Sequence, residues 1–308
     1  MSSYDVVVLG GGPAGLQAAL TLGRMHRRVL LLDAGGYRND PAGHLHNFLT
    51  HDGRPPAELR RLARVELAAY DTVTVRDEAA YSVVPDGDEF SVGTAAGPVA
   101  TRLVVLATGV RDTLPDKPGL ARVFGGAAAH CPFCHGHEYA GTPVGVLGSH
   151  PHVDRLAAML APIASEVVVL ADGGELDDGT RARLDSIGAS VRPDVVTGFR
   201  PSPLGTTVPF AAGPDLDLGG VLVATTLAQA APFAADLGLA LLPSGCVEVD
   251  GFGRTSVPGV YAAGDLAHTR LTPMPLASVL AAAAAGQLAA TACVADLLER
   301  DHGLAVPA

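Results

Sequence analysis

Short runs of consecutive apolar residues, separated by glycine-rich turns and helical patterns, recur along the chain. Residues 6–9 form a run of valine and leucine that is typical of a strand covered on both faces. A helical pattern follows through Arg24, and a second apolar run occupies residues 29–32. This order predicts a strand–helix–strand unit with parallel strands, and similar runs at 103–106 and 144–147 extend the prediction to an α/β protein.

A glycine-rich turn joins the first predicted strand to its helix. The turn reads Gly10-Gly11-Gly12-Pro13-Ala14-Gly15. In such a turn Gly10 permits the tight bend, Gly12 lets the backbone approach a pyrophosphate, and Gly15 allows close helix packing. The helix N-terminus carries partial positive charge, and Asp33 can accept hydrogen bonds from ribose hydroxyls. The pattern predicts that this turn and Asp33 bind a dinucleotide; a glycine turn that binds no phosphate is the alternative.

Two later segments bear on which dinucleotide is bound. The apolar run at 103–106 ends in a small-residue turn that includes Thr108 and Gly109. A strand pattern at 255–265 ends in Gly-Asp, ahead of a long alanine-rich helix. Here the sequence resembles the flavoprotein disulfide reductases that contain two dinucleotide-binding folds. The resemblance implies that FAD is the cofactor, that both segments belong to the FAD domain, and that Asp265 holds the ribityl chain.

The most specific motif is a pair of cysteines three positions apart, Cys131-Pro132-Phe133-Cys134. Such a pair can close a disulfide and exchange two electrons, and Pro132 suits the first turn of a helix, whose dipole favours a thiolate just before it. The motif looks like the redox centre of low-molecular-weight thioredoxin reductases. The resemblance implies that Cys134 faces the flavin and Cys131 the substrate, an order that the residues alone do not fix. A zinc site is the alternative, but no second Cys-x-x-Cys exists, so we expect no metal.

Two further residues are candidates for the site. His135 stands where thioredoxin reductases usually carry an aspartate, and a histidine there can exchange protons near neutral pH. The alternative is a helix-surface residue that hydrogen-bonds backbone. Asn47 lies in a segment that, by resemblance, runs near the flavin; an ordinary connecting loop is the alternative.

The resemblance covers nearly the whole chain and implies a domain organisation. The fold is α/β, with two Rossmann-like domains and the second inserted into the first. We expect a discontinuous FAD-binding domain at residues 1–112 and 245–308. The inserted NAD(P)-binding-like domain, which carries the cysteine pair, is expected at residues 113–244. By analogy with the family, the protein is expected to be a homodimer.

The second nucleotide-type turn departs from the fingerprint. After Gly148, His150 stands where the second glycine admits a pyrophosphate, and Pro151 alters the turn. The next apolar run is followed by Asp172 and Glu175, where the family carries a basic cluster for a 2′-phosphate. The pattern indicates a structural crossover without ordinary NADPH binding, although the helix N-terminus that follows leaves binding open.

Without nicotinamide, the natural direction of electron flow is reversed. A substrate dithiol would reduce the disulfide, the cysteines would reduce FAD, and oxygen would reoxidise the flavin to give hydrogen peroxide. This pattern resembles the gliotoxin and holomycin type of dithiol oxidase, which closes a disulfide in a small natural product. The alternatives are a thioredoxin reductase fed by NADPH or ferredoxin, and a non-catalytic flavin and thiol redox sensor.

Composition and charge exclude several other classes. The 308 residues are 48% apolar and 17% charged, with a formal charge of −11, so we expect a globular protein whose field repels nucleic acid and anionic membranes. Four cysteines are too few for a disulfide scaffold, and the first residues lack the features of a signal peptide, so we expect a cytoplasmic protein. Polar residues interrupt the alanine-rich stretch at 276–298, which predicts a buried helix and no membrane contact.

Overall fold

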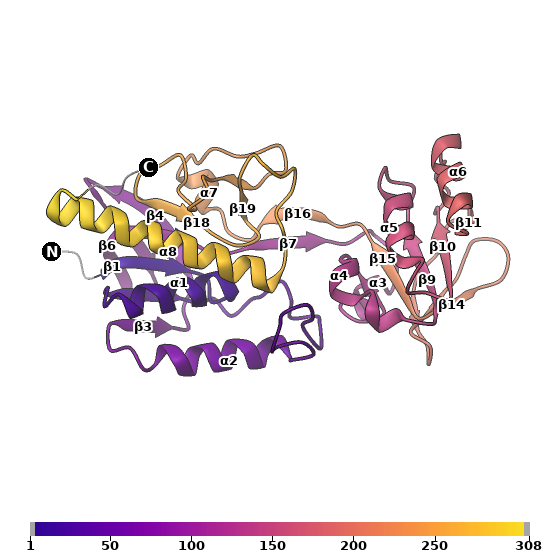
Figure 1. Cartoon of the computed structure of the whole chain (residues 1–308), viewed down its shortest axis with the longest axis horizontal. Coiled ribbons are helices and arrows are strands. Elements are labelled where there is room, and N and C mark those ends of the chain that lie inside the picture. The colour runs from indigo at the N-terminus through magenta and orange to yellow at the C-terminus, as the bar shows by residue number, and fades with distance from the viewer. Residues whose placement is uncertain (1–3, 305–308) are drawn as a thin grey trace. The chain divides into compact units, whose positions relative to one another are not determined.

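The computed structural model describes residues 4–304, which form two compact units. The first contains residues up to 38, 57–111 and those from 227 onward; the second contains 39–56 and 112–226. Each unit is a Rossmann-like α/β fold, and the second is inserted into the first (Figure 1).

Two unit boundaries differ from the predicted ones. The chain returns to the first unit at residue 227 and not at 245, because Leu227, Phe233 and Leu239 pack into the core of that unit. Residues 39–56 group with the second unit, although they follow the first strand–helix–strand unit in the sequence.

Within the described residues, the first unit holds a seven-stranded sheet in the order β3-β2-β1-β6-β5-β4, with β18 paired to β6. The strands β1, β2, β3, β6 and β18 run parallel, and β4 and β5 are antiparallel to their neighbours. The bounds are β1 (Tyr4–Leu9), β2 (Val29–Leu32), β3 (Val73–Arg76), β4 (Ala80–Asp86), β5 (Glu89–Thr94), β6 (Gly97–Leu106) and β18 (Val260–Ala262). β1 is central, and its apolar run is buried on both faces, as the sequence predicts.

Helices α1 (Pro13–Arg24) and α8 (Val279–His302) pack together on one face of this sheet (Figure 1). A Cβ at Gly286 of α8 would overlap the carbonyl oxygen of Ala14, so only glycine permits this approach. α8 begins at Val279 because Ser278 accepts a hydrogen bond from the amide of Ala281. The remaining elements are α2 (Pro56–Leu67), β7 (Val110–Thr113), β16 (Thr226–Gln229), α7 (Phe233–Asp236), β17 (Val247–Glu248) and β19 (Ala267–His268).

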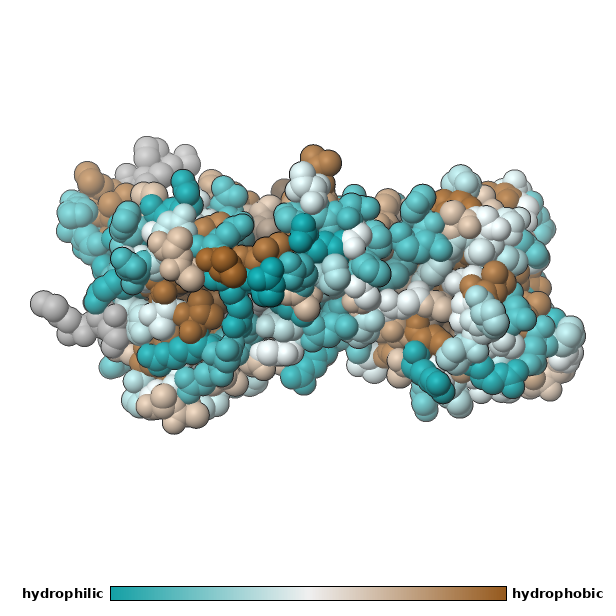
Figure 2. All heavy atoms as spheres, turned by 90° about the horizontal axis from the view of Figure 1, so that it is seen from below, coloured by the Kyte–Doolittle hydropathy of each residue, from teal (hydrophilic) through white to brown (hydrophobic). Residues whose placement is uncertain are grey.

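In the described part of the chain, α8 alone is long and apolar enough to cross a membrane by length and composition. Core helices of soluble proteins share this length and composition. Ala289, Cys293 and Leu297 of α8 are buried in the core that α1 shares. On the face seen in Figure 2, apolar residues form small groups separated by hydrophilic ones.

The second unit has a five-stranded parallel sheet within the same described range, in the order β11-β10-β9-β15-β8. Its strands are β8 (Ala128–Ala129), β9 (Pro143–Leu147), β10 (Glu166–Leu170), β11 (Ser190–Arg192) and β15 (Gly220–Val223). Its helices are α3 (Leu120–Val123), α4 (Pro132–His135), the 3₁₀ turn η1 (His137–Tyr139), α5 (Val153–Leu160) and α6 (Asp178–Ser186). A three-stranded antiparallel sheet completes the unit, with β12 (Arg200–Pro201), β13 (Thr206–Val208) and β14 (Leu216–Leu218).

Candidate active site

Cys131 and Cys134 form a disulfide in the second unit, with 5.3 Å between their Cα atoms. The chain leaves the buried strand β8 and enters α4 at Pro132, so Cys131 is the N-cap residue of that helix. No side chain of residues 4–304 caps α4, and the Cys131 carbonyl accepts from the amides of Cys134 and His135. Phe133, between the two cysteines, is 69% exposed. The sulfur pair therefore follows the carboxyl end of a strand, at the start of a helix, beside an exposed aromatic ring.

His135 is mostly buried, and its two ring nitrogens differ. Nε2 lies 3.3 Å from the carbonyl oxygen of Gly125, whereas Nδ1 is buried with no hydrogen-bond partner among the described residues. Since a carbonyl can only accept, Nε2 carries the proton and Nδ1 has a lone pair. Burial lowers the pKa of His135 below its usual 6.5, although the Gly125 carbonyl and Glu138 favour the charged form. The ring thus bonds backbone, as the plainer alternative expects, and still offers a neutral base.

Sequence reasoning missed an acidic and histidine cluster beside the disulfide. His46 lies between two carboxylates, with its Nδ1 3.5 Å from Asp52 and its Nε2 3.5 Å from Glu138. Glu138 raises the pKa of His135, and His46 lowers it. Glu138 follows the cysteine motif closely, but no linear signal connects His46 to it.

The loop before the cysteines fixes this arrangement. Tyr139 donates a hydrogen bond of 2.6 Å to the carbonyl of Gly126, and Gly125 adopts φ +88°. A Cβ at Gly125 would overlap the carbonyl of Pro41, so residues 39–56 pack directly on this loop. Asn47 lies in the same segment, where its backbone N–H donates a hydrogen bond of 2.7 Å to the carboxylate of Asp52. Its predicted flavin contact stays a prediction.

The glycine turn of the first unit fits a dinucleotide. Gly10 adopts φ +116°, and a Cβ there would overlap the carbonyl of Ala107. By contrast, no described atom apart from its chain neighbours lies within 4 Å of a Cβ built at Gly12. No side chain of the described residues caps α1, so the amides of its first turn are available to an anion. The turn thus combines tight backbone at Gly10 with open space at Gly12, where the pyrophosphate of FAD would approach.

Asp33 lies against this turn, since a Cβ at Gly11 would overlap its carboxylate. Asp33 accepts hydrogen bonds from the Gly35 amide at 3.0 Å, from the Tyr37 hydroxyl at 2.5 Å, and from Arg64 of α2. Burial opposes its ionisation, but these three donors outweigh burial and lower the pKa of Asp33. Asp33 is therefore an ionised, oriented acceptor at the predicted ribose position.

The other predicted FAD residues lie on the same edge of the first sheet. Thr108 and Gly109 follow the carboxyl end of β6, and Gly109 adopts φ +69°. Asp265 follows β18, and a Cβ at the preceding Gly264 would lie 3.0 Å from the Cβ of Ala14. The first unit thus brings the glycine turn, Asp33 and Asp265 to one edge of its sheet.

The corresponding edge of the second unit is filled by its own side chains. Asp172, at the end of β10, forms an ion pair with Lys117 at 2.7 Å and also accepts from the Val196 amide at 2.8 Å. His150 folds back on the turn, with its Nδ1 accepting from the His152 amide at 3.3 Å. α5 starts only at Val153. These residues do not fit an ordinary NADPH site.

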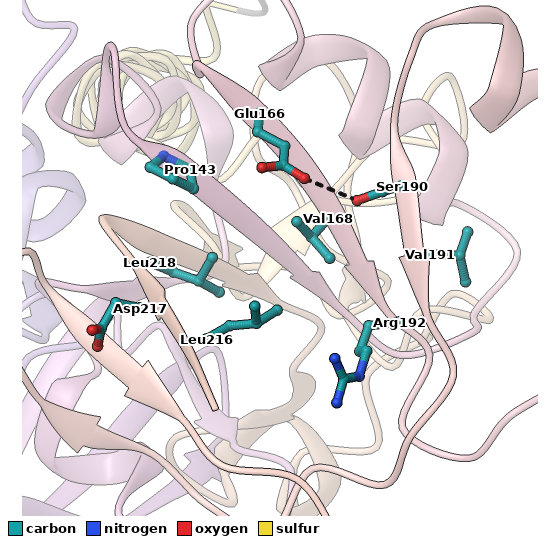
Figure 3. Close-up of a pocket in the computed structure, with 9 residues that line it drawn as sticks. All are labelled: Pro143, Glu166, Val168, Ser190, Val191, Arg192, Leu216, Asp217 and Leu218. Atoms are coloured by element: carbon teal, nitrogen blue, oxygen red, sulfur yellow. Dashed lines mark hydrogen bonds between the residues drawn. The ribbon is translucent and has the colours of Figure 1, made fainter. Parts of the chain in front are cut away.

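A separate pocket of about 270 Å³ lies in the second unit between β14 and the strands β9, β10 and β11, and it reaches from the first residues of those strands to Arg192 at the end of β11 (Figure 3). Its lining joins those strands to β14, and Glu166 accepts a hydrogen bond from Ser190 at 3.3 Å (Figure 3). The disulfide follows the carboxyl end of β8, so the pocket is not part of the redox site. Among residues 4–304, no group of three or more histidine, cysteine or acidic residues could hold a metal ion.

Comparison with known proteins agrees with this geometry. Residues 4–286 match the family model for pyridine nucleotide-disulphide oxidoreductases. The chain is 32% identical to thioredoxin reductase tcpT of Claviceps purpurea over 95% of both chains, and 32% identical to thioredoxin reductase sirT of Leptosphaeria maculans over 92% of this chain and 91% of that one.

Solved structures give the same result. An oxidoreductase from Agrobacterium tumefaciens superimposes with a TM-score of 0.87 at 31% identity, covering 97% of this chain and 99% of that one. The structure of HlmI gives 0.86 at 34% identity, covering 97% and 94%. The chain therefore belongs to the pyridine nucleotide-disulphide oxidoreductase family, as a thioredoxin reductase-like flavoprotein that binds FAD.

Proposed function

We propose that this flavoprotein is a dithiol oxidase that closes an intramolecular disulfide in a small-molecule dithiol. Its catalytic residues are Cys131, Cys134 and His135. The first glycine turn, Asp33 and Asp265 would hold FAD, which would supply a two-electron acceptor for the cysteine pair that O2 can reoxidise with release of hydrogen peroxide. The protein acts as a cytoplasmic homodimer in this proposal.

The observation that carries the proposal is the poor fit of NADPH to the turn after β9 and the end of β10 in the second unit. An NADPH-fed reductase needs a glycine turn open to a pyrophosphate and a basic group for the 2′-phosphate. Here His150 occupies the turn, and the end of β10 presents Asp172, already paired with Lys117. Electrons are therefore more readily supplied at the sulfur pair than at this edge.

The sulfur chemistry proceeds by two exchanges. One substrate thiolate attacks Sγ of Cys131, which forms a mixed disulfide and releases Cys134 as a thiolate. The second thiolate of the substrate attacks the substrate sulfur that is bonded to Cys131. This attack closes the substrate disulfide and releases Cys131 as a thiolate. The substrate loses two electrons and two protons, and the cysteine pair gains the electrons. The position of Cys131 before α4 favours its thiolate as a leaving group.

His135 provides a place for one of these protons. Its neutral Nδ1 has no partner among the described residues, while Nε2 is held by Gly125. A substrate thiol must lose its proton before it attacks, and Nδ1 can accept that proton near neutral pH. Glu138 then stabilises the charged ring.

The surroundings of the disulfide favour a small, largely apolar substrate. Phe133 is exposed, and residues 124–129 before the pair are phenylalanine, glycine and alanine with no charged side chain. An apolar body with two thiols can pack on Phe133, whereas Ala128 and Ala129 are buried in β8 and offer no surface.

The test is anaerobic mixing of the FAD-loaded protein with a small dithiol such as dithiothreitol and, separately, with NADPH, while the flavin absorbance is followed. We expect bleaching by the dithiol, no bleaching by NADPH, and recovery of colour with peroxide release when oxygen is admitted. Cys131→Ser and Cys134→Ser should abolish bleaching by the dithiol, while Cys246→Ser, at a buried free cysteine, should not. Bleaching by NADPH alone contradicts the proposal.

The second candidate function is a thioredoxin reductase. The names of the fungal relatives favour it, as does the N-terminus of α5, which follows the turn at Gly148. This candidate requires flavin bleaching by NADPH or reduced ferredoxin and onward reduction of a protein disulfide, so the same mixing experiment separates the two functions.

A further inference from the structure

An arginine that sequence reasoning assigned no role lies at the FAD edge of the first unit. Arg38, between β2 and α2, pairs with Asp265, with 2.8 Å between Nη1 and Oδ2. Their side chains are only 15% and 19% exposed, so the pair is largely shielded from water. The pairs Lys117–Asp172 and Arg102–Asp5 are shielded to a similar degree, so what distinguishes the Arg38–Asp265 pair is its place at the FAD edge of the first unit.

The position of the pair follows from Gly264. A Cβ at Gly264 would lie 3.0 Å from Ala14, in the first turn of α1. Asp265 is the next residue, and Arg38 contacts its carboxylate. These contacts place the guanidinium of Arg38 at the same edge of the sheet as the first turn of α1, where the pyrophosphate of FAD would bind.

Charge at this edge supports a role for Arg38 in binding the phosphates. The turn at residues 10–15 contains no charged side chain, whereas Asp33 and Asp265 each bring a carboxylate. Arg64 pairs with Asp33, and Arg38 pairs with Asp265, so each acid has its own arginine.

We infer that Arg38 is an FAD-binding residue that contacts the pyrophosphate and is oriented for that contact by Asp265. A guanidinium carries five N–H donors in a planar fork, so one edge can bind a carboxylate while another binds a phosphate oxygen. This inference concerns cofactor binding and does not depend on the direction of electron flow.

The alternative is that Arg38 only positions Asp265 toward the ribityl chain. FAD and ADP distinguish the two roles, because ADP has the pyrophosphate and the adenosine but no ribityl chain. A pyrophosphate contact affects both ligands equally, whereas an effect through Asp265 on the ribityl chain affects FAD alone.

The experiment titrates the apo form of the full chain with FAD and with ADP by calorimetry at two salt concentrations. For Arg38→Ala we expect Kd to rise about 10- to 100-fold for both ligands, with a weaker dependence on salt, because a charge-assisted contact is lost. Arg38→Lys should recover part of the affinity. The control is Arg102→Ala, since Arg102 is 19% exposed and pairs with Asp301 and Asp5 near the opposite end of the same sheet. Its Kd should change less than about twofold, as expected for a charge far from the phosphates.

Arg38→Gln keeps a donor for Asp265 without the charge, so it decides the question if Arg38→Ala does not fold. A rise in Kd for both ligands supports the inference. Unchanged ADP affinity in the Ala and Gln variants, or an equal loss in Arg102→Ala, overturns it.

Discussion

The glycine turns after β1 in the first unit and after β9 in the second unit stand on the same kind of strand–helix–strand scaffold. They differ in whether the space at the turn is open to a ligand. In the first unit, α1 begins at Pro13, directly after Gly12, and the space at Gly12 is free of described atoms other than its chain neighbours. In the second, four residues separate Gly148 from α5, and His150 bonds within the turn. The parallel strand pairs β1–β2 and β9–β10 are both intact. The fold of such a unit thus depends on its core, whereas nucleotide binding depends on a few turn residues.

The aspartates that follow β2 and β10 show the same difference between the two units. Asp33 directly follows β2 and Asp172 lies two residues after β10, and each is paired with a cation. Asp33 lies against the glycine turn, whereas Asp172 is bound to Lys117, the only lysine of the chain, and to the backbone of Val196. The same residue type therefore lies at the proposed cofactor turn in one unit and forms a structural ion pair in the other.

The largest expected effect comes from filling the open turn. Gly12 has an extended backbone, with φ −76° and ψ −178°, which valine adopts without strain, so Gly12→Val should leave the apo protein folded. The added side chain occupies the space of the pyrophosphate, and we expect FAD affinity to fall about 100-fold or more, since the loss of several phosphate contacts is involved. Flavin absorbance after purification and circular dichroism of the apo protein measure the two effects. Full flavin content would show that the first edge is not the cofactor site.

The next largest effect is expected at His135, which follows the cysteine pair of the second unit. His135→Ala should slow flavin reduction by a dithiol about 100-fold, as expected for loss of a general base. Burial lowers the pKa of His135 below 6.5, and only the neutral ring accepts a proton. The wild-type rate should therefore fall as pH decreases through that pKa, and this acid limb should be absent from the variant.

Stopped-flow rates between pH 5 and 8 test this, with His152→Ala as a control because His152 is exposed and lies at the other turn. An unchanged pH profile in His135→Ala would leave His135 with only its hydrogen bond to Gly125.

Much of the first edge was predictable because its signals are local. The strand, the glycine turn, the helix and Asp33 follow one another within 33 residues, and the structure places them as their order predicts. The start of α4 at Pro132 was predictable for the same reason.

The missed features depend on contacts between distant segments. His46 and Glu138 approach each other only because residues 39–56 pack on the loop at Gly125, and Arg38 meets Asp265 across most of the chain. The boundary at 226/227 was missed because the side chains that follow it pack into the first unit's core, which no local pattern reveals. Sequence periodicity carries none of this information.

A smaller effect should follow from removing the ion pair between Lys117 and Asp172 in the second unit. Lys117 and Asp172 are 18% and 21% exposed, so Lys117→Met leaves a partly buried carboxylate without its cation. We expect a loss of about 1–2 kcal/mol in the free energy of unfolding, less than for a fully buried pair. The control is Arg200→Met, whose pair with Asp215 is 62% and 44% exposed and should contribute about 0.5 kcal/mol or less. Urea denaturation measures both.

The same variant also tests how the second edge is closed. His150 still fills the turn in Lys117→Met, so NADPH should not bind, as measured by anaerobic titration calorimetry. Tight NADPH binding in the variant would mean that the ion pair alone closes that edge.

The smallest effect is expected from a methyl group on the second turn. Gly148 adopts φ +103°, which disfavours alanine, but a Cβ there meets only His150 at 3.5 Å, an ordinary contact. Gly148→Ala should therefore lower the free energy of unfolding by about 1 kcal/mol and leave flavin content and dithiol-driven bleaching unchanged. The matched variant is Gly10→Ala, with a similar φ of +116° but a Cβ that would overlap the Ala107 carbonyl, and it should lose FAD. Equal flavin loss in both variants would mean that the two turns are not divided between a cofactor and a structural role.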